Sequence, residues 1–149
     1  MRAVIQRVDQ ACVKINSQLY SAIDQGLLVL LGVEKGDSEK DADYLIEKTV
    51  NLRIFEDDQG KMNLSLSDIS GDMLVVSQFT LLGDCIKGRR PSFTRAEEPV
   101  RAIELYEYFV AQAAPRVRKL ATGRFQAMMK IELVNNGPVT LLVDSKKFF

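Results

Sequence analysis

The chain has 149 residues, of which 46% are hydrophobic and 27% are charged, and its 20 basic and 20 acidic residues leave no net charge. These values are typical of one soluble globular domain and exclude disordered and fibrous proteins. The chain contains no histidine, which excludes Ser-His and Cys-His catalytic machinery. We therefore expect one domain over residues 1–149.

The N-terminal half is predicted to consist mainly of strands. Apolar and polar residues alternate in Met1–Val8, which predicts a strand, and Ala11–Ile15 predicts a second strand paired to it. Gly26–Gly32 encloses five consecutive apolar residues and predicts a fully buried strand. This apolar stretch is far shorter than the roughly 20 residues of a membrane-spanning helix. We expect a cytoplasmic protein without membrane attachment.

Two amphipathic helices are predicted. The first begins near Ser38, where a serine side chain can cap free N–H groups. Its apolar face consists of Ala42, Leu45, Ile46 and Thr49. The second begins near Glu97–Pro99 and should end or kink at Pro115. Its expected core face consists of Val100, Ile103, Leu105 or Tyr106, Phe109, Val110 and Ala113.

The remaining elements are a turn at Asp57–Gly60, a buried strand at Asp72–Val76, and a final pair of strands. This pair, Ile131–Val134 and Val139–Val143, surrounds residues 135–138. The order of elements is mixed, so we expect an α+β fold. Its sheet should be mostly antiparallel and curled toward a barrel, with the two main helices packed on it.

Charge is unevenly distributed along the chain. Residues 1–85 contain 8 basic and 14 acidic residues, whereas residues 86–130 contain 10 basic and 4 acidic residues. The basic stretch could form a face that contacts phosphate groups, or it could be ordinary solvated surface. Its basic residues are Lys87, Arg89, Arg90, Arg95, Arg101, Arg116, Arg118, Lys119, Arg124 and Lys130.

Three short segments could carry chemistry. Ser77–Thr80, with the sequence SQFT, follows a hydrophobic strand, where a rigid sheet can present polar groups to a ligand. If the strand continued, Gln78 and Thr80 would share one face. The alternative is an ordinary polar strand end. Arg89–Phe93 combines basic and aromatic residues, which suits phosphate contact and base stacking or a plain surface turn.

The segment Asn135–Thr140 contains Gly137 followed by Pro138. Considered alone, it predicts a hairpin turn between the last two strands, although an X-Pro bond can also be cis at modest cost. The two cysteines, Cys12 and Cys85, are far apart and lack a CxxC pair or a histidine partner. We therefore expect free thiols, no metal site and no cofactor.

Several segments together resemble the D-aminoacyl-tRNA deacylase family, formerly described as D-tyrosyl-tRNA deacylases. They are MRAVIQRV at the start, GKMN at Gly60–Asn63, SQFT at Ser77–Thr80, RPSF at Arg90–Phe93 and NGPVT at Asn136–Thr140. They occur in order, and the resemblance extends from Met1 to about Val143. The tail, Asp144–Phe149, is not placed by the resemblance, and nothing is carried over to it.

The resemblance implies a homodimer that hydrolyses the ester bond of D-aminoacyl-tRNA. Ser77, Gln78, Phe79 and Thr80 would form the catalytic strand of one subunit. The partner subunit would close the pocket with a cis Gly137–Pro138 turn, which rejects L-amino acids but admits glycine. Arg7, in the matching IQRV, would brace the carbonyl groups of that turn.

Within this resemblance, Thr80 is expected to position the substrate, because a threonine hydroxyl is a weak nucleophile without a base. The Phe79 backbone N–H and Gln78 would supply an oxyanion site for substrate-assisted hydrolysis. Two alternatives remain open from the residues themselves. One is a non-catalytic RNA-binding module, and the other is a hydrolase of small acyl esters.

Overall fold

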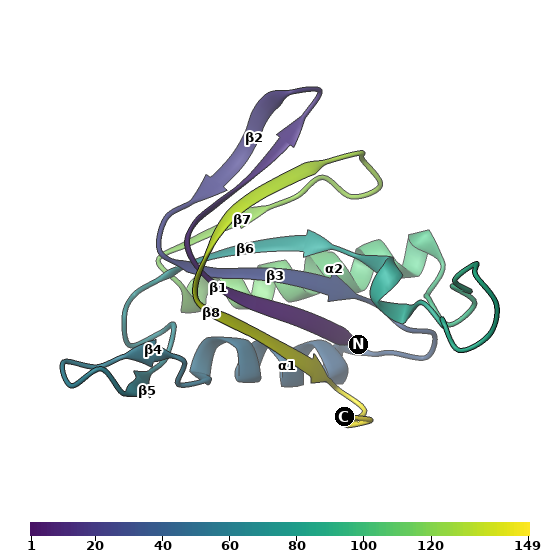
Figure 1. Cartoon of the computed structure of the whole chain (residues 1–149). Coiled ribbons are helices and arrows are strands. Elements are labelled where there is room, and N and C mark those ends of the chain that lie inside the picture. Colours follow the sequence, from purple (N-terminus) through teal and green to yellow (C-terminus); the bar gives the residue numbers. More distant parts are fainter.

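The computed structural model describes all 149 residues as one six-stranded sheet, a two-stranded sheet and two long helices (Figure 1). The strands are β1 (Arg2–Ile15), β2 (Gln18–Ile23), β3 (Gly26–Gly32), β4 (Phe55–Glu56), β5 (Met62–Leu64), β6 (Asp72–Ser77), β7 (Lys119–Thr122) and β8 (Lys130–Asp144). The helices are α1 (Glu39–Asn51) and α2 (Pro99–Ala113), with 3₁₀ turns η1 (Phe79–Leu82) and η2 (Ala114–Arg116).

The long strand β1 organises the sheet. The order of strands is β2-β1-β3-β6-β7, and β8 pairs with β1 along its other edge. β1 is antiparallel to its three neighbours, whereas the β3–β6 and β6–β7 pairs are parallel, with α1 and α2 in the two crossovers. The Ser21 hydroxyl on β2 donates to the Thr122 carbonyl on β7 at 2.8 Å. This contact links the edge strands β2 and β7, so the curled sheet is nearly closed.

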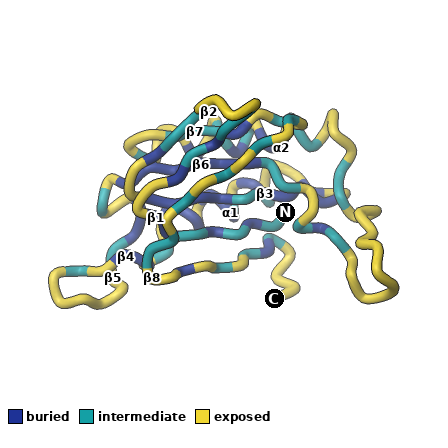
Figure 2. The backbone as a smooth tube through the Cα atoms, turned by 45° about the horizontal axis from the view of Figure 1, so that its top comes forward, coloured by how far each residue is buried: buried dark blue, intermediate teal, exposed yellow.

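The central strands β3 and β6 are buried on both faces of the sheet, as Figure 2 shows. Leu27, Val29 and Leu31 of β3 belong to the cluster formed with α1 and α2. Leu28 faces the opposite cluster, which lies inside the curl of the sheet. Because successive strand residues point to opposite faces, a strand buried on both sides must be apolar throughout. This explains the apolar run in β3.

The predicted α+β class, the curled sheet and the two packed helices are confirmed. The apolar face predicted for α1 is buried, with Val50 added to it. α2 begins at Pro99 and ends before Pro115, as expected. Val100, however, is 76% exposed. At 3.6 residues per turn it lies on the opposite side of the helix from Phe109, so it cannot share that core face.

Two predictions of paired strands were wrong. Met1–Val8 and Ala11–Ile15 belong to one continuous strand, β1, and the two C-terminal segments belong to β8. The polar residues Asp9 and Gln10 interrupt the apolar alternation without ending β1, because β8 follows β1 around its bend. β2 and β7 were not predicted. Neither α1 nor α2 has the length and apolar composition of a membrane-spanning helix.

Candidate functional site

The SQFT segment lies at the end of β6, on the right in Figure 1. The Gln78 N–H donates to the Leu31 carbonyl at 2.8 Å, which is the last bond that holds the segment to β3. The chain then turns into η1, and the Gly83 N–H closes this turn on the Thr80 carbonyl at 3.0 Å. The strand alternation expected for residues 77–80 is therefore wrong beyond Ser77, because the strand ends there.

Gln78 and Thr80 nevertheless come together. The Gln78 amide donates a hydrogen bond to the Thr80 hydroxyl, and both side chains are accessible to solvent. An amide cannot remove the hydroxyl proton in either orientation of its plane, because it is not a base at neutral pH. The arrangement thus holds the Thr80 hydroxyl in position without activating it as a nucleophile.

A pocket of about 630 Å³ opens beside this segment. Its walls come from the end of β6 with η1, the start of α2, and the loop between β7 and β8. Most lining residues are apolar, and Phe79 and Phe93 make an edge-to-face contact with ring centroids 5.2 Å apart. The lining also includes Ser77, Gln78, Ala102, Phe125, Gln126, Met128, Met129 and Ile131.

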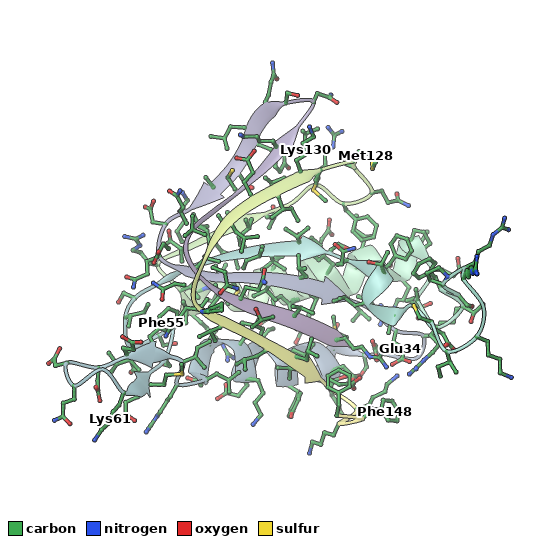
Figure 3. The ribbon with its side chains drawn as sticks, viewed as in Figure 1. Glu34, Phe55, Lys61, Met128, Lys130 and Phe148 are labelled. Atoms are coloured by element: carbon green, nitrogen blue, oxygen red, sulfur yellow. The ribbon has the colours of Figure 1, made fainter.

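Part of this lining was not anticipated from the sequence. Met128 lies on the loop before β8 and is 93% exposed, and Figure 3 shows it at the rim of the molecule near Lys130. Phe125 and Met129 belong to the same loop, which has no helical or strand periodicity. The only available signal was a cluster of large apolar residues outside any regular element. Two carboxylates, Glu97 and Glu98, also line the pocket.

The Gly137–Pro138 bond is cis, and both residues are exposed. They do not form the predicted hairpin turn. Gln6 pairs with Thr140 and Val8 pairs with Asn135, so four residues of β8 lie opposite Arg7 alone. We call these four residues, Asn136–Val139, the β8 bulge. A bulge of this kind lets a strand continue while part of it projects from the sheet.

Arg7 is only 5% exposed and fixes the β8 bulge through hydrogen bonds from the interior of the protein. Its Nε donates to the Asn136 carbonyl at 3.1 Å, its Nη2 to Asn136 Oδ1 at 3.1 Å, and its Nη1 to the Ile54 carbonyl at 2.6 Å. The expected contact with the Gly137 and Pro138 carbonyls is thus replaced by contacts to Asn136. An added Cβ at Gly137, where φ is +122°, would lie 2.9 Å from Arg7 Nη2, so only glycine fits.

The SQFT segment and the β8 bulge lie far apart within one chain. Leu27 of β3 is level with Arg7 and with Met73, whereas Ser77 is four residues further along β6. With strands about 4.8 Å apart and a rise of about 3.3 Å per residue, the two motifs are separated by roughly 20 Å. Figure 1 agrees, since the bend of β8 and η1 lie at opposite ends of the sheet.

The chain contains no group of three or more histidine, cysteine, aspartate and glutamate side chains that could hold a metal ion. Cys12 and Cys85 are free thiols, and Cys85 is exposed. The polar groups beside the pocket are hydroxyl, amide, backbone N–H and carboxylate groups, and any chemistry that the protein supplies at this site has to use them.

Comparisons with known proteins agree with this architecture. Residues 4–144 match the D-Tyr-tRNA(Tyr) deacylase family. The chain is 65% identical to a D-aminoacyl-tRNA deacylase of Syntrophus aciditrophicus (strain SB) and 58% identical to one of Thermosipho melanesiensis, in both cases over the full length of both chains.

Solved structures share the fold. A c-Myc DNA Unwinding Element Binding Protein superimposes with a TM-score of 0.92 at 37% identity, covering 97% of this chain and 98% of the other. A probable eukaryotic D-amino acid tRNA deacylase gives a TM-score of 0.81 at 17% identity over 96% and 98%, which shows the fold alone. From these matches, the chain belongs to the D-aminoacyl-tRNA deacylase family of hydrolases, which act on ester bonds.

Proposed function

We propose that this chain hydrolyses the ester that joins a D-amino acid to the terminal ribose of tRNA. The observation that carries the proposal is the apolar pocket beside Ser77–Thr80. Its volume falls within the range of about 300–1,000 Å³ that is usual for small-molecule sites. Aromatic and thioether side chains on two of its walls suit the flat face of the terminal adenine. This base would bring the ester to the polar end of β6.

The chemistry needs little from the protein. An aminoacyl ester is activated by its own ammonium group, and the adjacent ribose hydroxyl can orient water or assist the leaving oxygen. Gln78 can donate to the developing oxyanion, as can the Phe79 N–H, since the first N–H groups of a helix have no partner within it. Thr80 positions the substrate. Hydrolysis then proceeds by geometry and oxyanion stabilisation, without a protein nucleophile.

Selection for the D-enantiomer would come from the partner subunit of a homodimer. Gly137 and Pro138 of the β8 bulge are exposed, the bulge is fixed by Arg7, and it lies roughly 20 Å from the pocket of its own chain by the strand spacings. A projecting segment of this kind can act as a wall in a second copy. An L side chain would meet that wall, whereas a D side chain would point away from it. Glycine has no side chain, so misplaced glycine should also be removed.

The direct test is parallel hydrolysis of D-, L- and glycyl-tRNA by the purified protein. We expect D- and glycyl-tRNA to be cleaved and L-aminoacyl-tRNA to survive. Binding of tRNA without any release of amino acid would instead support a non-catalytic RNA-binding module. Equal cleavage of small acyl esters and charged tRNA would support a general esterase.

The cross-subunit arrangement can be tested separately by mixing subunits. One chain would carry Pro138→Ala, which removes the exposed ring of the β8 bulge, and the other would carry Gln78→Ala. The Gln78→Ala homodimer should be strongly impaired, whereas the Pro138→Ala homodimer should also cleave L-aminoacyl-tRNA. In a heterodimer, the pocket with an intact SQFT segment would receive the intact bulge of the other subunit, so D-aminoacyl-tRNA should be cleaved at about half the wild-type rate and L-aminoacyl-tRNA should be rejected. Verified heterodimers that cleave L-aminoacyl-tRNA would assign the bulge to the pocket of its own subunit.

A further inference from the structure

Ion pairs divide the basic stretch into two groups. Four of its ten cations have a carboxylate oxygen within 4.0 Å, and these pairs are Arg95–Glu34, Arg101–Glu104, Arg116–Glu47 and Arg118 with Asp24 and Asp72. The other six are exposed and form no ion pair: Lys87, Arg89, Arg90, Lys119, Arg124 and Lys130. A free, exposed cation can bind a phosphate without first breaking an ion pair, so the second group is the better candidate for contact with nucleic acid.

Three of the free cations share one loop beside the pocket. Asp84 and Ser92 pair through two backbone hydrogen bonds of 2.7 and 2.9 Å, which close the loop at its base. The next residue, Phe93, lines the pocket. Since an extended chain spans at most about 3.5 Å per residue, and each of the three cations is at most three residues from Asp84 or Ser92, their Cα atoms lie within roughly 11 Å of this base. In Figure 1 the loop projects beyond the end of the sheet.

One more free cation lies on the other side of the pocket, because Arg124 immediately precedes residues 125–129, which line it. Lys130 follows these residues, but it begins β8, and successive strand residues point to opposite faces, so its side chain lies on the face away from Ile131, which lines the pocket. Lys119 begins β7 opposite Asp72, at the end of the sheet away from the SQFT segment. Four free cations therefore flank the pocket, and we call them the cationic rim: Lys87, Arg89, Arg90 and Arg124.

We propose that the cationic rim binds the phosphates of the single-stranded 3′ end of tRNA, next to the terminal nucleotide held in the pocket. The proposal rests on the function proposed above. A single-stranded nucleic acid bound through a base in an apolar pocket leaves its nearest phosphates at the pocket mouth, where these cations lie. Each neutralised phosphate releases counterions, which makes the binding salt-dependent. We assign the four ion-paired cations a structural role instead, through their contacts with carboxylates.

The test compares two triple variants that remove the same charge. Lys87→Gln, Arg89→Gln and Arg90→Gln remove the loop part of the rim, whereas Arg101→Gln, Arg116→Gln and Lys119→Gln remove three exposed cations outside it. Affinity for deacylated tRNA is measured from 50 to 300 mM salt. The rim triple should flatten the log-log slope by about 2, since each phosphate contributes roughly 0.7–0.9. The control triple should change it by less than about 0.5. Equal flattening in both triples would overturn the proposal.

A second readout separates phosphate binding from damage to the pocket. D-aminoacyl-adenosine has the ester and the base but no upstream phosphate. The rim triple should raise KM for D-aminoacyl-tRNA by about 10- to 100-fold, and it should leave hydrolysis of D-aminoacyl-adenosine within about threefold of wild type. Equal loss on both substrates would refute a phosphate role. Wild-type protein that cleaves neither substrate would refute the proposed function, while the slopes with deacylated tRNA would still decide the role of the rim.

Discussion

The two ends of the sheet differ in how their polar groups are held. Beside the pocket, Gln78 and Thr80 are accessible and bond mainly to each other. At the other end, the buried guanidinium of Arg7 makes three hydrogen bonds that fix the β8 bulge. The pocket end is therefore open, and the bulge end is rigid. A group that contacts the reacting atoms of a substrate must be accessible to that substrate. A segment that excludes one enantiomer must instead be held in a fixed position.

Arg7→Ala should have the largest effect, because it removes the three hydrogen bonds that fix the β8 bulge. The Ile54 carbonyl and Asn136 would lose a charged donor in a buried place, which typically costs about 3 kcal/mol of unfolding free energy when several such bonds are lost. Rejection of L-aminoacyl-tRNA should be lost, because the β8 bulge is no longer fixed. Urea unfolding and parallel hydrolysis of D- and L-aminoacyl-tRNA measure the two effects.

Arg7→Lys is the matched variant for this prediction. It keeps the charge but lacks the planar fork that reaches Asn136 and Ile54 together. It should fold and yet discriminate less between D- and L-aminoacyl-tRNA. Full discrimination in both variants would contradict the view that Arg7 fixes the chiral wall.

Gln78→Ala should have the next largest effect, at the open end. Loss of one oxyanion donor typically lowers kcat by about 10²–10³. The urea midpoint should not move, because the side chain is accessible and bonds only to Thr80. Gln126→Ala is the control, since Gln126 is another amide that lines the pocket. A similar kcat for the two variants would remove Gln78 from the chemistry.

Asp72 offers a test of pH dependence at the start of β6. Its buried carboxylate accepts hydrogen bonds from Arg118 Nε at 2.8 Å and from the Asp24 N–H at 3.1 Å. The bond from Arg118 lowers the pKa of Asp72, although burial opposes this. A carboxyl whose pKa is lower in the folded state stabilises the protein above its unfolded pKa, near 3.9, and this stabilisation is lost as the pH falls through the folded pKa.

Asp72→Asn should therefore lower the unfolding free energy by about 2 kcal/mol at pH 7. The difference from wild type should stay constant down to about pH 5 and shrink below about pH 4. Denaturant titrations at each pH provide the measurement. Hydrolysis at pH 7 should be unchanged in the folded fraction, because Asp72 lies away from both motifs. A difference in unfolding free energy that grows as the pH falls would mean that folding raises the pKa of Asp72 instead of lowering it.

Thr80→Ala should have the smallest effect. No base contacts the Thr80 hydroxyl, so its loss should reduce kcat by no more than about tenfold. Thr80→Ser, which keeps the hydroxyl, should remain close to wild type. Single-turnover hydrolysis of D-aminoacyl-tRNA would measure both. Complete loss in Thr80→Ala, with tRNA binding intact, would restore Thr80 as the nucleophile.

Sequence patterns predicted the elements whose burial is periodic. The apolar run of β3 and the stripe of α1 are local signals, so both elements were predicted correctly. β2 was missed because Leu19 and Tyr20 are exposed and hide the alternation. β7 has only four residues. The continuity of β1 depends on its pairing with β8, which lies more than 100 residues away in the sequence, and no local pattern reports such a pairing.

The candidate site shows the same limit. The cis Gly137–Pro138 bond was expected from the family resemblance, but its position in a bulge rather than a turn depends on the pairing register. The role of Arg7 in holding Asn136 could not be read from the residues alone. The aromatic wall containing Phe125 comes from an irregular loop. The separation of the basic residues into paired and free cations required the partners from other elements to be known.

The pairing of β1 with β8 has a consequence for how the molecule forms. β1 can join β2 and β3 as soon as these hairpin neighbours exist, but its outer edge must wait for residues 130–144. Closing so long a loop is slow and leaves an unpaired strand edge exposed in the meantime. During synthesis on the ribosome, the β8 bulge can take shape only after nearly the whole chain has emerged. The growing chain thus acquires its pocket-forming helix α2 before the segment proposed to distinguish enantiomers.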